Sequence, residues 1–353
     1  MRVGVDGRKL PRGLERGAAD SLDLARDLGL DGVFFRTVLD MSPTLDLGEL
    51  RAIRSHADEL GMYLEAGLGK VNPYALPEAP EIRAAGDGDT RLGFERMLRA
   101  CAEIACLELW VATANYKSQY RGNFAYDRFR TDVTWPEQLR ASEAFLKQLA
   151  PVARDLGIHM NLETHEEITT FESVRLVEAV GPDVMGITFD VGNVVQRGES
   201  PVRAAERVAP YVRQTHMKDV VLAFAPDGVQ RQPRPCGQGL VDFDAILPLL
   251  ARSRPQLHLS IENPTDLSVA TFEFFNPAWH ASHADLSTEE RDEFVSLVSS
   301  DPAVLAARAA EVFGYEESVA LLHESARHLR GILARHGLGQ PPARSAARRQ
   351  AFE

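Results

Sequence analysis

Four short runs of apolar and β-branched residues in the middle of the chain each end in a side chain that can bind a metal ion. The runs close on Glu163 in NLETHEE, Asp190 in TFDVGN, His216 in QTHMKD and Glu262 in SIENP. Three carboxylates and one imidazole form an oxygen-rich set that suits Mn²⁺ or Mg²⁺ and can also hold Co²⁺ or Zn²⁺. A single carboxylate at a strand end is usually a helix cap, but clustered unpaired carboxylates repel one another. We therefore expect one divalent ion at these residues, with Mn²⁺ in first place.

The strands that carry these residues are part of a longer alternation. Short β-type runs alternate with amphipathic helical segments, and eight runs qualify as strands: Arg2–Asp6, Gly32–Arg36, Met62–Ala66, Leu107–Ala112, Ile158–Glu163, Met185–Asp190, Val212–His216 and Leu257–Glu262. An open doubly wound sheet would usually carry a phosphate-binding glycine loop after its first strand, and GVDGRKLPRG is not such a loop. The pattern predicts an α/β fold, a (β/α)8 TIM barrel, with its active site at the carboxyl ends of the strands.

Three helical patterns follow the eighth strand. Ser287 and Glu290 form a capping box for the first, and Asp301–Pro302 begins the second. The third is expected to be the eighth barrel helix, because it places five apolar residues on one face: Val319, Leu322, Ala326, Leu329 and Leu333.

The domain organisation follows from these segments. We expect a single barrel over residues 1–336, which includes a helical insertion at 276–314 after strand eight. Residues 337–353 lack an apolar period and are predicted to be a disordered tail. The insertion carries enough aromatic and aliphatic side chains to need a burial surface, so a homo-oligomer or a small partner subunit is left open.

Composition limits the partners and the compartment. The 353-residue chain has 39 Lys and Arg against 51 Asp and Glu, a net charge of −12, and such a surface repels phosphate backbones and anionic lipid. We expect no nucleic acid and no membrane as partners, since no run approaches the ~20 apolar residues of a membrane span. The start, MRVGVDGRKL, lacks the apolar core of a signal peptide, and the three cysteines form no CxxC pair. A cytoplasmic protein is therefore expected.

The chain resembles the xylose-isomerase-like TIM-barrel superfamily, the sugar phosphate isomerase/epimerase group that includes ketose 3-epimerases and inosose dehydratases. The resemblance rests on the four strand ends above and on two phrases beyond strand seven, HMKD at 216–219 and PCGQGLVDF at 235–243. It covers roughly Arg2 to Glu262 and resumes in the last helix. It implies a metal bound by the four residues named above, and it implies that Glu163 and Glu262 also transfer protons.

Four further side chains are candidates for binding the substrate. Two of them lie two residues beyond a predicted ligand and point to the same side if the strand continues, while the other two lie at the ends of strands three and four. Each also has a structural alternative as a buried histidine, an ion-paired lysine or a helix cap. The candidates are His165, Lys218, Glu65 and Asn115.

These residues together predict a metal-dependent enzyme acting on a small carbohydrate. A divalent ion stabilises the enediolate that forms when a carboxylate removes a proton next to a carbonyl. Return of that proton gives a sugar or polyol isomerase or epimerase, which is the first hypothesis. Loss of a β-group from the same enediolate gives a lyase, either a keto-inositol dehydratase or the barrel subunit of a C-glycoside deglycosidase acting on 3-keto glycosides. A non-catalytic sugar-binding barrel is the third and least favoured reading.

Overall fold

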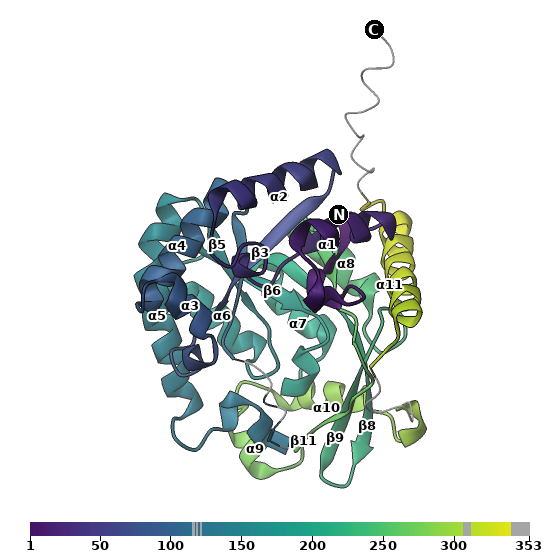
Figure 1. Cartoon of the computed structure of the whole chain (residues 1–353). Helices are drawn as coiled ribbons and strands as arrows, with labels where there is room; N and C mark the ends of the chain where they lie inside the picture. The colour runs from purple at the N-terminus through teal and green to yellow at the C-terminus, as the bar shows by residue number, and fades with distance from the viewer. Residues whose placement is uncertain (115–116, 118, 121, 306–311, 340–353) are drawn as a thin grey trace.

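Eight parallel strands close into a barrel, which confirms the predicted fold class (Figure 1). The structure is a computed structural model and describes the chain except residues 115–116, 118, 121, 306–311 and 340–353. The order around the barrel is β1-β10-β7-β6-β5-β4-β3-β2. Its strands are β1 (Arg2–Asp6), β2 (Gly32–Phe34), β3 (Tyr63–Lys70), β4 (Glu108–Ala112), β5 (His159–Glu163), β6 (Met185–Asp190), β7 (Val212–Met217) and β10 (His258–Ile261).

Two barrel strands differ from the prediction by more than one residue at an end. β2 ends at Phe34, two residues early, because Thr37 already caps the short helix η3 (Val38–Asp40) and turns the chain away from the barrel. β3 continues to Lys70 and shifts register against β4 between Gly67 and Gly69. Gly69 has a φ of +105°, a conformation that favours glycine, so the bulge lets the strand continue.

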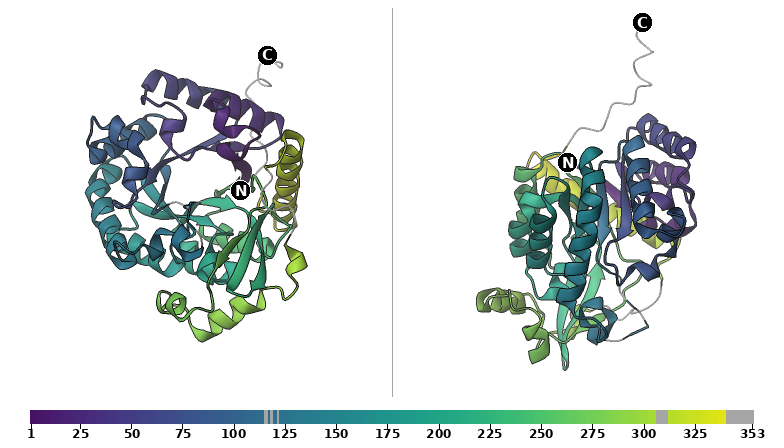
Figure 2. Two further views of the ribbon diagram at one scale, coloured as in Figure 1. Left: turned by 60° about the horizontal axis from the view of Figure 1, so that its bottom comes forward. Right: turned by 90° about the vertical axis from the view of Figure 1, so that its left-hand side faces the viewer.

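Helices surround the barrel, as the view in Figure 2 along its axis shows. Several of them are followed by a glycine with positive φ that turns the chain toward the next strand, as at Gly29, Gly61 and Gly157. The helices are α1 (Ala18–Asp27), α2 (Leu47–Glu59), α3 (Pro80–Ala85), α4 (Thr90–Glu103), α5 (Trp135–Asp155), α6 (Thr170–Val180), α7 (Pro201–Val208), α8 (Phe243–Ser253), α9 (Pro277–Ala281), α10 (Thr288–Ser296) and α11 (Tyr315–Arg335).

A second sheet, which the sequence analysis missed, stands at one end of the barrel. β8 (Asp219–Ala225) and β9 (Gly228–Arg234) form an antiparallel hairpin after β7, and β11 (Ala270–Phe272) pairs with β9. The turn contains Gly228, where a Cβ would lie 2.2 Å from the carbonyl oxygen of Phe272, so the close approach of β11 requires glycine. In Figure 1 this sheet lies at the bottom, beside α9 and α10.

The expected insertion is helical only in part. The capping box of Ser287 and Glu290 is present at the start of α10, as predicted. The second expected helix is a short 3₁₀ turn, η9 (Pro302–Val304), and the segment after it lies partly outside the described residues. Phe272, Phe274, Trp279 and Phe294 form an aromatic cluster that joins the insertion to the second sheet.

The last helix closes the ring of barrel helices. α11 packs against α8 and β1 and buries Leu322, Ala326, Leu329 and Leu333 of the predicted face, whereas Val319 is half-buried. Of the predicted tail, residues 340–353 lie outside the described part of the chain.

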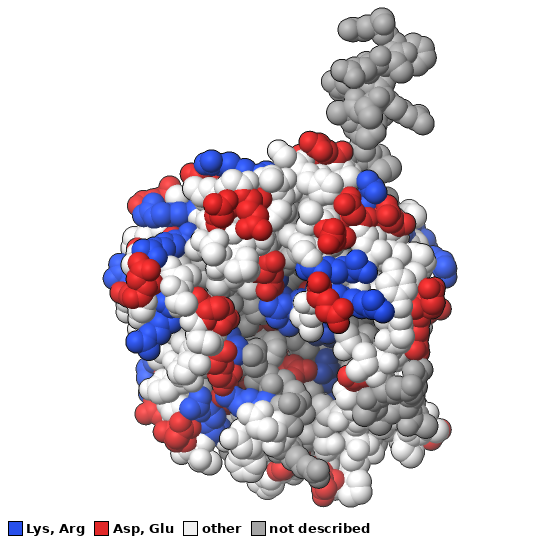
Figure 3. Space-filling model, viewed as in Figure 1, with Lys and Arg blue, Asp and Glu red and all other residues white. Residues whose placement is uncertain are grey.

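Among the described helices, none combines the length and the apolar character needed to cross a membrane. Lys and Arg are interspersed with Asp and Glu over the face drawn in Figure 3, without a continuous basic surface.

Candidate metal centre

The four predicted ligands meet at the carboxyl ends of neighbouring strands. Glu163 and Asp190 are the last residues of β5 and β6, His216 precedes the last residue of β7, and Glu262 follows β10 directly. All four are buried, and each offers one ligand atom such that these atoms lie within 4.8 Å of one another. The cluster could therefore hold a metal ion.

His216 stands between the two glutamates. Its Nδ1 lies 3.0 Å from Glu163 Oε1 and 3.6 Å from Glu262 Oε2. The ring is held edge-on by Phe34 of β2, with 4.8 Å between ring centroids. Its buried Nε2 has no hydrogen-bond partner among the described residues.

Lys218 supplies positive charge to the same cluster. Its Nζ lies 2.8 Å from Asp190 Oδ2 and 2.7 Å from Glu262 Oε2. Gly192 makes room for this side chain, because a Cβ there would lie 2.5 Å from Lys218 Cγ. The other oxygen of Asp190 accepts hydrogen bonds from the backbone of Gly192 and Asn193, at 3.0 and 3.1 Å, so the carboxylate is fixed in orientation.

The three carboxylates have different proton affinities. Burial raises the pKa of Asp190 to about 7, against the opposing charge of Lys218. Burial acts the same way on Glu163, but the charge of His165 and the hydrogen bond from His216 outweigh it and lower the pKa to about 2. For Glu262 the charges of Lys218 and Arg36 outweigh burial and hold the pKa well below its usual range. Both glutamates are therefore ionised at neutral pH.

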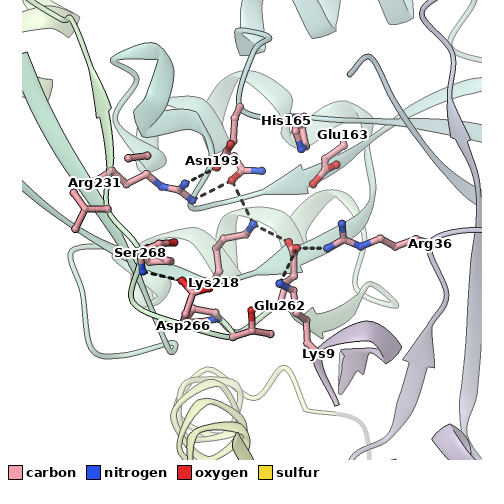
Figure 4. Close-up of a pocket in the computed structure, with 16 residues that line it drawn as sticks. Lys9, Arg36, Glu163, His165, Asn193, Lys218, Arg231, Glu262, Asp266 and Ser268 are labelled. Carbon is pink, nitrogen blue, oxygen red and sulfur yellow. Dashed lines mark hydrogen bonds and ion pairs between the residues drawn. The ribbon is translucent and has the colours of Figure 1, made fainter. Parts of the chain in front are cut away.

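Two cations from the first quarter of the chain also reach Glu262. Arg36 donates to Glu262 and to Asp6 Oδ2, the latter at 2.9 Å. Lys9, from the short helix η1 (Gly7–Lys9), lies 4.0 Å from Glu262 Oε1. Figure 4 shows Lys9, Arg36 and Lys218 converging on this carboxylate.

A second polar layer supports the other side of the cluster. Trp110 Nε1 donates to Glu163 Oε2 at 3.0 Å. His165 is hydrogen-bonded through Nδ1 to the buried Glu167. Burial opposes its charged form, but Glu167 and Glu163 outweigh this and raise the pKa of His165 to about 10, so its imidazole is protonated at neutral pH.

The cluster opens into a cavity of about 470 Å³. The β8-β9 hairpin forms one wall through Arg231, which binds Asn193 Oδ1 at 3.1 Å and Glu166 at 2.5 Å. The loop after β10 forms the rim with residues 264–270. Asp219 anchors the hairpin, because its carboxylate accepts hydrogen bonds from four backbone N–H groups. The donors are those of Val220, Gly237, Gly239 and Val241. These bonds join the HMKD segment to the PCGQGLVDF segment.

The predicted substrate-binding residues divide into three groups. His165 and Lys218 line the cavity. Glu65 is not among the described residues that line it; its carboxylate lies 2.8 Å from His258 Nδ1 and 3.4 Å from Ser260 Oγ, inside the barrel at β10. Its position at a predicted strand end was misleading because β3 runs on to Lys70. Asn115 lies outside the described residues.

Several residues of the site were not predicted. Asp6 and Arg36 close the first and second predicted strands, so the rule that found the ligands would have found them had it been applied to all eight strand ends and to arginine as well. Trp110 carried no signal beyond an apolar strand. Lys9 and Arg231 enter from a turn and from the unpredicted hairpin, and no pattern in the sequence indicated them.

The donor set fits a divalent ion on the observations of this structure. Three buried carboxylates and an imidazole with an unsatisfied nitrogen share one small volume. Such a group of like charges needs compensating cations, which Lys218, Arg36 and Lys9 supply in part and which a divalent ion would complete. Oxygen-rich sites with one imidazole suit Mn²⁺ and Mg²⁺ and accept Zn²⁺.

The chain belongs to the xylose isomerase-like TIM barrel family, whose model matches residues 22–298. The resemblance inferred from the strand ends is thereby confirmed at the level of the family.

Curated relatives match parts of the chain. It is 29% identical over 200 residues to an uncharacterized protein, YihM, of Escherichia coli (strain K12), a match that spans 55% of this chain and 60% of the relative. It is 32% identical over 105 residues to a 3-oxo-isoapionate decarboxylase of Pectobacterium atrosepticum, spanning 29% and 38% of the two chains. It is 26% identical over 147 residues to inosose dehydratase 1 of Bacillus cereus, spanning 36% and 48%. The chain thus spans less than two thirds of each relative.

Among solved structures, a D-psicose 3-epimerase determined in the presence of D-fructose is similar over 96% of this chain and 100% of that chain, with a TM-score of 0.60 and 18% identity. At this identity the likeness concerns the fold.

Proposed function

We propose that this chain is a divalent-metal-dependent enzyme that moves a proton on a carbon next to the carbonyl of a sugar or polyol, as an isomerase or epimerase. The observation that carries the proposal is the position of two ionised glutamates around one imidazole, with Glu163 and Glu262 at 3.0 and 3.6 Å from His216 Nδ1. Membership of the xylose isomerase-like family and the shared fold with a D-psicose 3-epimerase support it.

The ion, Mn²⁺ on the basis of the donor set, would be held by Glu163, Asp190, His216 and Glu262 and would polarise the carbonyl of the substrate. Glu163 and Glu262 are the proton-transfer groups, since each is ionised and can accept a proton from carbon. One glutamate removes the proton and the other returns it on the opposite face in an epimerase. Return to the neighbouring carbon gives an aldose–ketose isomerase. The charged His165 and Lys218 bind oxygens that gain negative charge.

A lyase is the second candidate, and His165 is the observation that favours it. A protonated imidazole in the cavity can donate a proton to a departing hydroxyl group, which a simple proton shuttle does not need. Two partly matching relatives, a dehydratase and a decarboxylase, carry names of this reaction class. The candidates are a keto-inositol dehydratase and the barrel subunit of a C-glycoside deglycosidase acting on 3-keto glycosides.

The cytoplasmic location, a homo-oligomer and a small partner subunit stay predictions.

Deuterium exchange tests the proposal whatever the final product. The Mn²⁺-loaded protein is incubated in D₂O with a panel of ketoses, keto-inositols and keto-glycosides, and carbon-bound deuterium is measured by mass spectrometry and NMR. Deuterium in a product with an unchanged elemental formula indicates an isomerase or epimerase, and deuterium with loss of water or an aglycone indicates a lyase. Absence of exchange across the panel, with metal bound, contradicts both candidates.

A further inference from the structure

We infer that the substrate of this site is an acidic sugar, with a carboxylate next to its reacting carbons, and that Lys9 and Arg36 bind this carboxylate. The inference rests on the proposed function, because it names the class of substrate that the same cavity would take.

Charged side chains of both signs line the cavity. Four are lysines and arginines, namely Lys9, Arg36, Lys218 and Arg231, and four are carboxylates, namely Glu163, Glu166, Glu262 and Asp266. Two of the carboxylates, Glu163 and Glu262, are candidate metal ligands. The charge that a substrate meets therefore depends on which of the lysines and arginines lacks an acceptor.

Two of these cations already have a carboxylate partner that is not a candidate metal ligand. Each pair lies at the edge of the cluster and is compensated whether or not the ion is bound. The pairs are Arg231 with Glu166 at 2.5 Å and Arg36 Nε with Asp6 Oδ2 at 2.9 Å.

The other two cations, Lys9 and Lys218, face the metal ligands. A divalent ion offsets two of the three negative charges of the ligand carboxylates, which leaves one. Lys218 offsets that remaining charge, so Lys9 is left without a compensating carboxylate in the inner part of the cavity. Lys9 Nζ has no hydrogen-bond acceptor among the described residues, and its ion-pair contact is with Glu262 at 4.0 Å. The negative charge of Asp266 lies at the rim, where this carboxylate accepts the backbone N–H of Ser268 at 2.8 Å. The inner part of the cavity therefore has room for one anionic group beside Lys9.

Asp6 sets both cations in place before any ligand binds. Its Oδ1 accepts the backbone N–H of Arg8 at 2.8 Å and so shapes the turn that carries Lys9. Its Oδ2 binds Arg36 Nε, which leaves the far end of the guanidinium directed at Glu262. An arginine held by a buried carboxylate loses little side-chain entropy when it binds an anion, and the turn shaped by the same carboxylate places Lys9 beside it.

The distance to the cluster favours a carboxylate over a distant phosphate. Both cations reach Glu262, a candidate ligand, so an anion that they bind is attached within one or two carbons of the atoms at the metal (Figure 4). A carboxylate attached directly to the reacting carbon chain fits this spacing. The phosphate of a sugar phosphate shares the anionic chemistry, and the experiment separates the two.

Matched ligands that differ at one carbon test the inference. D-fructose and 2-keto-D-gluconate share the configuration of carbons 3 to 5, as do L-sorbose and 2-keto-L-gulonate, and each acid has a carboxylate in place of the hydroxymethyl group at carbon 1. D-fructose 1-phosphate supplies the phosphate arm. Dissociation constants are measured by calorimetry on the protein saturated with Mn²⁺, for the wild type and for Lys9→Gln, Lys9→Arg, Arg36→Gln and Arg8→Gln.

We expect at least one acid to bind about tenfold more tightly than its ketose. Lys9→Gln and Arg36→Gln should reduce this preference to within about twofold, and Lys9→Arg should retain most of it. Arg8→Gln is the matched control, because Arg8 is adjacent in sequence but pairs with Asp40 at 2.9 Å on the surface.

Several outcomes would overturn the inference that the substrate is an acidic sugar. Binding of both ketoses as tightly as the acids, or no binding of any probe, overturns the inference, as does a preference for acids that Lys9→Gln and Arg36→Gln leave unchanged. Tighter binding of D-fructose 1-phosphate assigns the cations to phosphate and also overturns it. Deuterium exchange into neutral ketoses without binding of acids refutes this inference alone, whereas Lys9-dependent binding of acids without exchange into any substrate refutes the proposed function alone.

Discussion

Lys218 Nζ lies 2.8 Å from Asp190 Oδ2, so a lysine and a buried aspartate form an ion pair inside the candidate metal cluster. The ammonium group occupies the side of the carboxylate that faces Glu262, at 2.7 Å from its Oε2. In the metal-free protein this lysine is the cation that contacts both Asp190 and Glu262, whose charges an ion would otherwise neutralise. Lys218 and a bound ion therefore compensate the same carboxylates, so the loss of one should matter less when the other is present.

Lys218→Gln should destabilise the metal-free protein far more than the Mn²⁺-loaded protein. Removal of one partner of a buried ion pair leaves an uncompensated charge and costs about 3–5 kcal/mol, whereas a bound ion replaces that charge. Thermal or urea unfolding with and without Mn²⁺ measures the two effects. Lys147→Gln is the control, since Lys147 pairs with Glu143 at 2.6 Å on an exposed helix face. Equal destabilisation in both states would show that the ion and Lys218 do not compensate the same charges.

Binding of Mn²⁺ should weaken as the pH falls through neutrality. Burial raises the pKa of Asp190 to about 7, and a carboxyl group must lose its proton before it can bind an ion. Below that pKa the proton competes, so this carboxyl group alone lowers the affinity about tenfold between about pH 8 and pH 6. His216 adds to the slope: burial opposes its charged form, but its hydrogen bond with Glu163 outweighs burial and raises its pKa, and an imidazole must be neutral to bind an ion. Calorimetric titration across this range measures the slope. An affinity independent of pH over this interval contradicts the assignment of Asp190 as a ligand, and Asp190→Asn should reduce the slope, leave the part due to His216, and weaken binding at every pH.

Glu163→Gln and Glu262→Gln separate proton transfer from metal binding. The amide retains an oxygen that can bind the ion but is too weakly basic to accept a proton. We expect a modest loss of metal affinity and a fall in turnover of about 10²–10⁴-fold for each variant. Metal content is measured by mass spectrometry and turnover with the substrate found by deuterium exchange.

The two glutamine variants need not behave alike. In an epimerase, the variant that lacks the abstracting carboxylate loses solvent exchange at carbon, while the variant that lacks the returning carboxylate still exchanges without inversion. Glu166→Gln is the matched control, because Glu166 lines the same cavity but pairs with Arg231. Turnover near the wild-type value in both glutamine variants would falsify the proton-transfer assignment.

The barrel and its metal cluster could be predicted because both depend on local patterns. Apolar runs of strand length set the eight strands, and parallel strands in a barrel bring their carboxyl ends together, so residues more than 90 positions apart meet at one site. The strand register then brings individual ligands together, since Asp190 on β6 is directly paired with His216 on β7. No knowledge of side-chain contacts was needed for these four residues.

The remainder of the site depends on features without a local pattern. Arg231 reaches the cavity from a hairpin whose strands contain charged and proline residues, so the alternation expected of a strand is weak there. Lys9 is placed by a single turn that Asp6 caps, and Glu65 is drawn inside the barrel by His258, almost 200 residues later. Such placements result from tertiary ion pairs, which a one-dimensional reading of the chain does not reveal.

Trp279→Ala tests whether the insertion supports the barrel without contributing to the metal site. Trp279 is fully buried and stacks on His283, with 3.7 Å between ring centroids, and it packs against Gly198 after β6. Its truncation should cost about 3–5 kcal/mol, as for other buried tryptophans. Mn²⁺ affinity should remain within about twofold of wild type, a free-energy difference of about 0.4 kcal/mol, because none of the four candidate ligands lies in the insertion. Trp279→Phe, which retains an aromatic ring, should recover part of the stability. Urea unfolding and metal titration on the same samples measure both quantities, and a large loss of metal affinity at small cost in stability would instead show that the insertion positions the site.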